Sequence, residues 1–115
     1  MKLDRVMEVL GGKVYTSVPY DDIDINAACG ADLMSDALAF GADKGLLLTG
    51  LNNPQCIRTA EMMDIHCVVL VRGKEPDATL VELANDKDII VMKTDFSMYT
   101  SCGRLYEAGL AGGDV

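Results

Sequence analysis

Residues 45–73 constrain the fold of this chain more than any other segment. Two short apolar runs, 46–48 and 67–71, lie at its ends, and neither alternates with polar residues. Such uninterrupted runs are typical of strands that are buried on both faces of a parallel sheet. A helix is expected to start between them at Pro54, because proline fits the first position of a helix. Strand, helix and strand in this order predict a βαβ crossover unit.

The expected helix from Pro54 carries one apolar stripe. Its residues Cys56, Ala60 and Met63 follow each other at helical spacing, and polar residues such as Arg58 and Glu61 stand between them. This spacing places the apolar side chains on a single face, which can pack against a sheet.

The remainder of the chain continues the alternation of strands and helices. Further helices are expected at residues 2–10, 32–40, 78–86 and from 98 onward, and further strands at 13–16, 24–30 and 89–92. A polar turn is expected at 41–45 and a frayed, glycine-rich tail at 111–115. The pattern predicts the α/β class, with a mostly parallel sheet between helices on both faces, in three layers.

Helix ends and buried faces can also be assigned from the residue pattern. The pair Gly11-Gly12 is expected to end the first helix, Asp77 to cap the fourth, and either Asp95 or Ser97 to cap the last. The predicted buried positions of the second and last helices are Leu33, Ala37, Phe40, Met98, Cys102, Leu105 and Gly109.

Length and charge restrict the organisation and the partners. The 115 residues predict one domain, 1–115, in which 1–12 form an N-terminal helix. A formal charge of −8 disfavours nucleic acid as a partner. No apolar run approaches the about 20 residues that cross a bilayer, and charged residues interrupt the N-terminal segment, so neither a membrane span nor a signal peptide is expected. A cytoplasmic location follows as the expectation.

The four cysteines are predicted to be buried, structural side chains. Cys29, Cys56, Cys67 and Cys102 each lie in an apolar segment and form no C-x-x-C pair. Zinc sites usually take ligands from closely spaced pairs, so no metal site and no cofactor is expected.

Three loops at the carboxyl ends of the predicted strands form the candidate ligand site. Open parallel sheets bind ligands along this edge. The candidate residues are Thr49, Gly50, Asn52, Asn53, Arg72, Gly73, Lys74 and Thr94. Hydroxyls, amides, a flexible glycine backbone and cations are suited to a phosphate or a carboxylate. The alternative is that Thr49, Asn52 and Asn53 only cap helices and turn the chain.

No catalytic constellation is recognisable in the sequence. Neither G-x-x-x-x-G-K-[ST] nor G-x-G-x-x-G is present. The single histidine, His66, precedes a buried strand and is expected to be structural. Serines 17, 35, 97 and 101 lack a G-x-S-x-G context. Asp32 and Asp36 form a possible acid pair on a helix, although a cap and a solvent-facing residue explain them more simply.

Three longer segments carry a family resemblance. They are GADLMSDALAF (30–40), LLLTGLNNPQCIRTAEMMDIHCVVLVRGKEPD (46–77) and IIVMKTDFSMYTSCGRL (89–105). With these segments the chain resembles the DRTGG domain family over about residues 14–110. Two departures stand out, since Asn52-Asn53 replaces a common Asp-Arg pair and Val71-Arg72-Gly73 replaces a common Thr-Gly-Gly.

The resemblance implies a non-catalytic role. Similar domains occur beside CBS domains in regulatory pyrophosphatases, in phosphotransacetylases and at the amino terminus of HPr kinase/phosphorylase, where other domains perform catalysis. The expected function is a regulatory or assembly module that forms a homodimer and senses a small anionic metabolite or nucleotide at the strand-end loops. A protein partner is a further expectation.

Two alternatives remain open at this point. One is a small phosphotransfer or hydrolytic enzyme that uses the strand-end loops. The other is a redox-responsive adaptor that uses the cysteines. It is suggested by similar stand-alone domains that are encoded near iron-only hydrogenase and electron-transfer genes.

Overall fold

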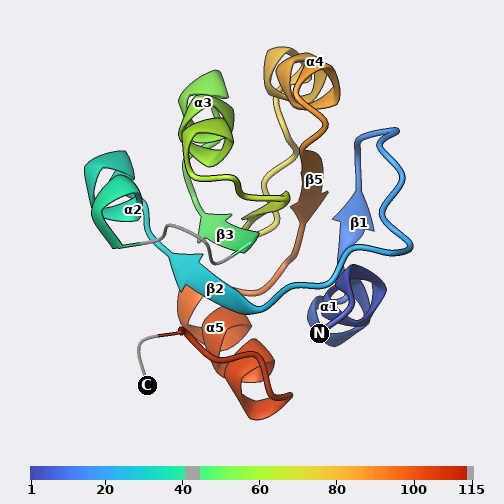
Figure 1. Cartoon of the computed structure of the whole chain (residues 1–115), viewed down its shortest axis with the longest axis vertical. Coiled ribbons are helices and arrows are strands. Elements are labelled where there is room, and N and C mark those ends of the chain that lie inside the picture. The colour runs from blue at the N-terminus through green and yellow to red at the C-terminus, as the bar shows by residue number, and fades with distance from the viewer. Residues whose placement is uncertain (41–44, 114–115) are drawn as a thin grey trace.

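Five strands form one sheet in the computed structural model, which describes residues 1–40 and 45–113. The strands are β1 (Lys13–Val14), β2 (Ala27–Gly30), β3 (Gly45–Thr49), β4 (Cys67–Leu70) and β5 (Ile90–Lys93). Their order across the sheet is β1-β5-β4-β3-β2 (Figure 1). Neighbouring strands from β2 to β5 are parallel, and only β1 is antiparallel to its neighbour. The mostly parallel sheet predicted from the sequence is confirmed.

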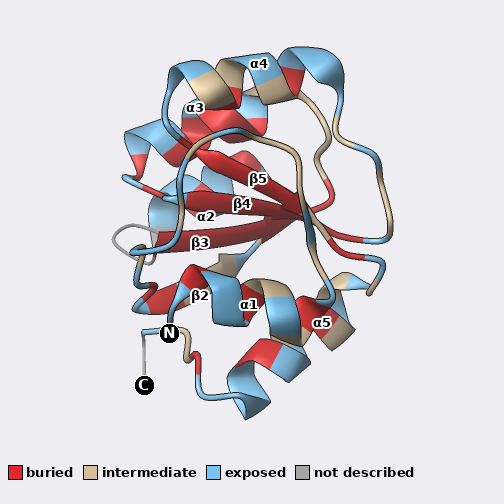
Figure 2. Cartoon of the chain, turned by 90° about the vertical axis from the view of Figure 1, so that its right-hand side faces the viewer, coloured by how far each residue is buried: buried red, intermediate tan, exposed pale blue. Residues whose placement is uncertain are grey.

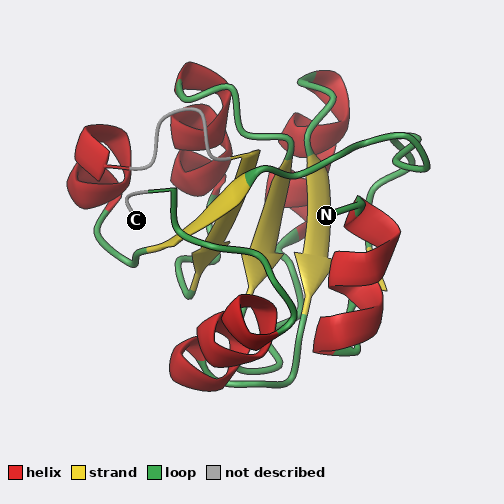
Figure 3. Cartoon of the chain, turned by 60° about the horizontal axis from the view of Figure 1, so that its bottom comes forward, coloured by secondary structure: helices red, strands yellow, loops and turns green. Residues whose placement is uncertain are grey.

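Helices cover both faces of the sheet, as predicted. They are α1 (Leu3–Leu10), α2 (Met34–Phe40), α3 (Pro54–Met62), α4 (Ala78–Asp86) and α5 (Met98–Glu107). Figure 2 shows the buried strands between α3 and α4 on one side and α1 and α5 on the other. Figure 3 shows the same division of the helices around the sheet from another direction.

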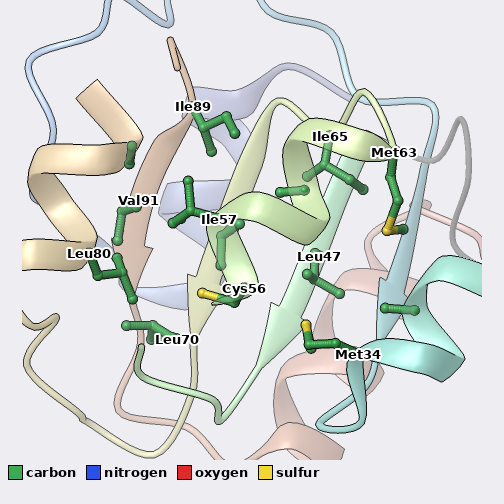
Figure 4. Close-up of a cluster of buried hydrophobic side chains, with 14 residues drawn as sticks. Met34, Leu47, Cys56, Ile57, Met63, Ile65, Leu70, Leu80, Ile89 and Val91 are labelled. Carbon is green, nitrogen blue, oxygen red and sulfur yellow. The ribbon is translucent and has the colours of Figure 1, made fainter. Parts of the chain in front are cut away.

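The central strands supply side chains to two separate cores. Leu47 packs with α2, α3 and α4, whereas its neighbours Leu46 and Leu48 pack with α1 and α5. Figure 4 shows the first core, in which Cys56 and Ile57 of α3 lie beside Leu47. Because successive strand residues point to opposite faces, two covered faces need an uninterrupted apolar run.

The second helix begins later than predicted, and it buries Ala37 as predicted but Met34 in place of Leu33. It starts at Met34 rather than at residue 32, and Met34 and Ala37 are the buried positions. Leu33, predicted to face the core, is 62% exposed. The reason is that Asp32 accepts a hydrogen bond from the Gly50 backbone, which keeps residues 31–33 in the turn after β2. The Phe40 side chain and residues 41–44 lie outside the described part.

The last helix also differs from its predicted buried stripe. Its cap is Ser97, which accepts a hydrogen bond from the Thr100 backbone N–H, and not Asp95. The buried side chains are Ser101 and Leu105, while Cys102 is only half-buried. Gly109 lies beyond the helix end and is exposed.

Some strand boundaries also differ from the predictions. β1 and β2 are shorter than expected, and β5 is shifted by one residue toward the carboxyl terminus. The predicted tail starts as an ordered segment, because the Ala111 carbonyl accepts a hydrogen bond from the Ala28 N–H at 3.2 Å. Residues 114–115 lie outside the described part. Within the described residues, every helix is too short or too polar to cross a bilayer.

Candidate functional site

The loops that follow β3, β4 and β5 lie side by side at one edge of the sheet. The strand register places Thr49 level with Leu70, and Leu70 level with Lys93. Backbone hydrogen bonds continue past the strand ends, from Val71 N–H to the Thr49 carbonyl at 3.1 Å and from Gly73 N–H to the Thr94 carbonyl at 2.8 Å. Parallel strands that end in register therefore bring these loops together, as the sequence predicted.

Gly50 is the point at which the charged side chains of this edge meet. Its carbonyl accepts a hydrogen bond from Lys74 Nζ at 2.5 Å, and its N–H donates to Asp32 Oδ1 at 2.6 Å. A methyl group on the Gly50 α-carbon would lie 2.3 Å from Arg72 Nη2 and 3.2 Å from Asp32 Oδ1. A larger residue at position 50 would therefore displace the guanidinium, which is the far end of an exposed, flexible side chain.

The backbone after β4 holds Arg72 in an unusual conformation. Arg72 has φ 65°, in the left-handed region, and Gly73 follows with φ 70°. A non-glycine residue adopts this conformation at a cost and only when surrounding contacts hold it. The Arg72 N–H donates to the Phe96 carbonyl at 2.8 Å, which ties this turn to the loop after β5.

The two asparagines of the β3 loop are occupied by contacts within the chain. Asn53 caps α3, because its side-chain oxygen accepts a hydrogen bond from the Gln55 N–H at 2.9 Å. Asn52 joins two loops, since its Nδ2 donates to the Glu75 carbonyl at 2.7 Å and its Oδ1 accepts from the Asp77 N–H at 3.0 Å. Asp77 stands at the cap position of α4, as predicted, but its side chain forms no capping hydrogen bond.

The two candidate threonines are buried and support the backbone. Thr49 Oγ1 accepts a hydrogen bond from the Leu51 N–H at 3.1 Å. The Thr94 hydroxyl donates to the Leu10 carbonyl at 2.7 Å and accepts from the Phe96 N–H at 3.3 Å. Thr94 is thus directed toward α1, away from Asn53, so the candidate residues do not all converge in one pocket.

Asp32 belongs to this edge, although it is not among the residues predicted for the ligand site. It lies two residues beyond β2, outside α2, so Asp32 and Asp36 do not form a carboxylate pair on one helix. Its position after a predicted parallel strand could have indicated this location, because residues that follow parallel strands lie together at the carboxyl edge of the sheet. The hydrogen bond itself joins residues that are 18 positions apart, so no short sequence motif could have predicted it.

The remaining polar candidates do not form a catalytic group at this edge. His66 is exposed at the amino end of β4, where it borders a depression with Glu61, Asp64, Lys87 and Asp88. In the described part of the chain, no three His, Cys, Asp or Glu side chains are arranged to hold a metal ion.

The cysteines divide into two buried and two half-buried side chains. Burial raises the pKa of the Cys56 thiol to about 11 and raises that of Cys67 as well. Cys29 and Cys102 are partly exposed, contrary to expectation, because β2 is an edge strand and Cys102 lies on the flank of α5. Cys29 packs against the core of α2 and α3, and Cys102 contacts Gly30 from the α5 side. Both cysteines nevertheless line one depression beside β2, and the pKa of Cys102 is raised by burial and by its proximity to Cys29.

Comparison with known proteins supports the fold. No family model matches this chain, and no curated protein sequence matches it. The structure is similar to a crystal structure of the CBS and DRTGG domains from the regulatory region of a Clostridium perfringens pyrophosphatase, complexed with the activator diadenosine tetraphosphate. The TM-score is 0.71 at 13% sequence identity, over 98% of this chain and 51% of that chain. The chain therefore spans about half of that structure, and the likeness supports a DRTGG-like fold.

Proposed function

We propose that this chain is a non-catalytic regulatory and assembly module that binds a small anion, such as an anionic metabolite or a nucleotide, beside Gly50. The observation that carries this proposal is the approach of two cationic side chains, Arg72 and Lys74, to the same glycine. Arginine and lysine are the residues that most often bind phosphates and carboxylates.

Donors remain for a ligand at this position. Arg72 is exposed, and its guanidinium forms no ion pair within the described residues. Lys74 is half-buried and uses one of its three N–H donors on the Gly50 carbonyl. At Gly50 these two cations meet one carboxylate, that of Asp32, so positive charge is in excess there although the chain carries −8.

The contact with Asp32 indicates that the Gly50 N–H can donate a hydrogen bond to a negatively charged oxygen. The Asp32 carboxylate oxygen lies 2.6 Å from that nitrogen, at the length of a strong, charge-assisted hydrogen bond. An anionic ligand oxygen has the same chemistry. We therefore place the ligand between Arg72 and Lys74, with Asp32 at its border, and we leave Asn53 and Thr94 in their structural roles.

The similar structure is consistent with regulation. That structure is part of a regulatory region and contains a nucleotide activator. Among the described residues that contact Gly50, no hydroxyl or thiol is hydrogen-bonded to a carboxylate or a histidine, which is the arrangement that hydrolytic and transfer enzymes use. Binding without turnover is thus the function that the site supports best.

A binding screen tests the proposal. The full chain is titrated with phosphate, acetyl phosphate, ATP and diadenosine tetraphosphate, and heat of binding and melting temperature are measured. A ligand that binds only the folded state raises the melting temperature. We expect Arg72→Ala and Lys74→Ala each to weaken the binding of the responding anion about tenfold or more. We expect Gly50→Ala to do the same by displacing Arg72.

Arg58→Ala is the matched control, because Arg58 is exposed on α3 and its loss changes the charge equally. The site would be excluded if no anion bound. It would also be excluded if Arg58→Ala weakened binding as much as Arg72→Ala, since the effect would then be one of net charge.

A further inference from the structure

Gly103 lies in the interior of α5, where nothing in the described part of the chain requires a glycine. A Cβ atom added there would meet nothing within 4 Å. Its φ lies outside the positive range, so the backbone does not require glycine. Glycine weakens a helix relative to alanine. A glycine that the folded chain does not need points to a contact made by another molecule.

The face of α5 around Gly103 is apolar and exposed. Tyr99, Gly103 and Tyr106 follow each other at i, i+4 and i+7, which places them on one stripe. The tyrosines are 89% and 63% exposed and border the same shallow depression as Gly103. Ser101 and Leu105, on the opposite face, are buried. Among the described residues, the helix thus has a second, exposed apolar face opposite the one that it buries.

We propose that this stripe, Tyr99, Gly103 and Tyr106, is the surface through which two copies of the chain associate. The two α5 helices pack antiparallel about a twofold axis near Gly103. Glycine lets the helices approach closely, and Tyr99 of each copy meets Tyr106 of the other. Tyrosine is favoured at interfaces because it buries a large area and loses little side-chain entropy. This inference rests on the assembly part of the proposed function and names its surface.

Charge complementarity favours a second copy as the occupant. Arg104 lies over the Phe96 ring, 4.2 Å from its centroid, so its guanidinium points toward the amino end of α5. Glu107 is the last residue of α5, and within the described residues neither charge forms an ion pair. In the antiparallel arrangement the amino end of one helix meets the carboxyl end of the other. Arg104 of each copy then faces Glu107 of the other, on a patch that is balanced in charge although the chain carries −8.

The oligomeric state of the full chain tests this proposal. Sedimentation velocity is measured from micromolar to millimolar concentration, where a dimer has twice the 12.4 kDa of one chain. We expect the wild type to dimerise and Gly103→Gln to raise the dissociation constant at least about tenfold. The melting temperature of the monomer should not fall, because the added side chain enters open space. Ala39→Gln, also small to large on an exposed helix position, is the matched control and should leave the dimer unchanged.

A charge exchange tests the orientation of the helices. Arg104→Glu and Glu107→Arg should each weaken the dimer, and the double variant should restore it, because the pairs re-form with reversed sign. A strictly monomeric wild type, or a dimer insensitive to Gly103→Gln, would overturn the proposal. Anion binding is measured on the same proteins. A dimer through α5 without anion binding would refute the Gly50 site alone, whereas anion binding by a monomer would refute the α5 surface alone.

Discussion

Asp64 and Asp88 occupy equivalent positions after two successive helices. Both have left-handed backbones, with φ 55° and 56°. In each case the next residue donates its N–H to a carbonyl of the preceding helix at 2.9 Å, from Ile65 to Ala60 and from Ile89 to Ala84. This bond pattern is that of a helix stop in which glycine is the usual left-handed residue. The chain therefore uses one device twice, with aspartate where glycine is favoured.

Replacing either aspartate with glycine should stabilise the protein. Glycine adopts the left-handed conformation without the steric cost that other L-residues pay. We expect Asp64→Gly and Asp88→Gly each to raise the free energy of unfolding by roughly 0.5–1 kcal/mol. Chemical denaturation measures this change. Glu82→Gly, in the interior of α4, is the opposing control and should lower stability by about 1 kcal/mol. If Asp64→Gly and Asp88→Gly lowered stability instead, the aspartate side chains would contribute more to stability than their left-handed backbones cost.

The Asn52 side chain should contribute more to the free energy of unfolding than an exposed polar side chain usually does. It bonds the Glu75 carbonyl and the Asp77 N–H, and thus joins the β3 loop to the loop before α4. Because two hydrogen bonds are lost, Asn52→Ala should lower the free energy of unfolding by about 1–2 kcal/mol. Asn53→Ala removes a helix cap and should cost about 1 kcal/mol. Gln55→Ala, at an exposed position of α3, serves as the control, and an equal effect there would refute the role of Asn52.

Tyr15 should retain its proton to unusually high pH. Its hydroxyl donates to Glu75 Oε2 at 2.6 Å, and this hydrogen bond, with smaller effects from burial and nearby carboxylates, raises the pKa of Tyr15 to about 12. The folded state holds this proton more tightly than the unfolded state. Its stabilising effect is therefore complete below about pH 10, the ordinary tyrosine value, and is lost as pH rises through about 12.

Tyrosinate absorbance, measured as the difference between wild type and Tyr15→Phe, reports this titration. Glu75→Gln should move the Tyr15 pKa back toward its ordinary value, because the charged acceptor is gone. Glu82→Gln removes the same charge from α4 and should leave the Tyr15 titration in place. An unchanged titration in Glu75→Gln would contradict the assignment.

Thiol labelling should separate the cysteines into two classes. Cys56 and Cys67 are buried, and the pKa of each is raised by that burial, so little reactive thiolate forms. Burial also raises the pKa of the Cys102 thiol, but Cys29 and Cys102 are partly exposed, and exposure is what distinguishes the two classes. We expect a disulfide reagent to label Cys29 and Cys102 in the native protein and to reach the other two only after unfolding. Single replacements Cys29→Ser and Cys102→Ser assign the reactive positions. Rapid native labelling of Cys56 would show that the α3 core opens.

The candidate site was only partly predictable from the sequence. The loops after β3 and β4 were identified because parallel strands that follow each other in the chain end at a common edge. The close approach of Arg72 to Gly50 was not predictable, since it depends on a left-handed turn and on the register between two strands. The roles of Asn52 and Thr94 were unpredictable for the same reason, because their partners lie far away in sequence.

The sequence by itself determined the class of fold and the start of α3, and it narrowed the start of α5 to Asp95 or Ser97. Apolar runs without alternation specify strands buried on both faces, and Pro54 and Ser97 act within one helical turn, so neither signal needs distant residues. Only the tertiary structure decided which side of α2 faces the core, where the Asp32 contact with Gly50 moves the helix start and leaves Leu33 in solvent. It also decided that Gly103 stands in open space. These features depend on how elements pack across the sheet, and packing is a property of distant residues brought together.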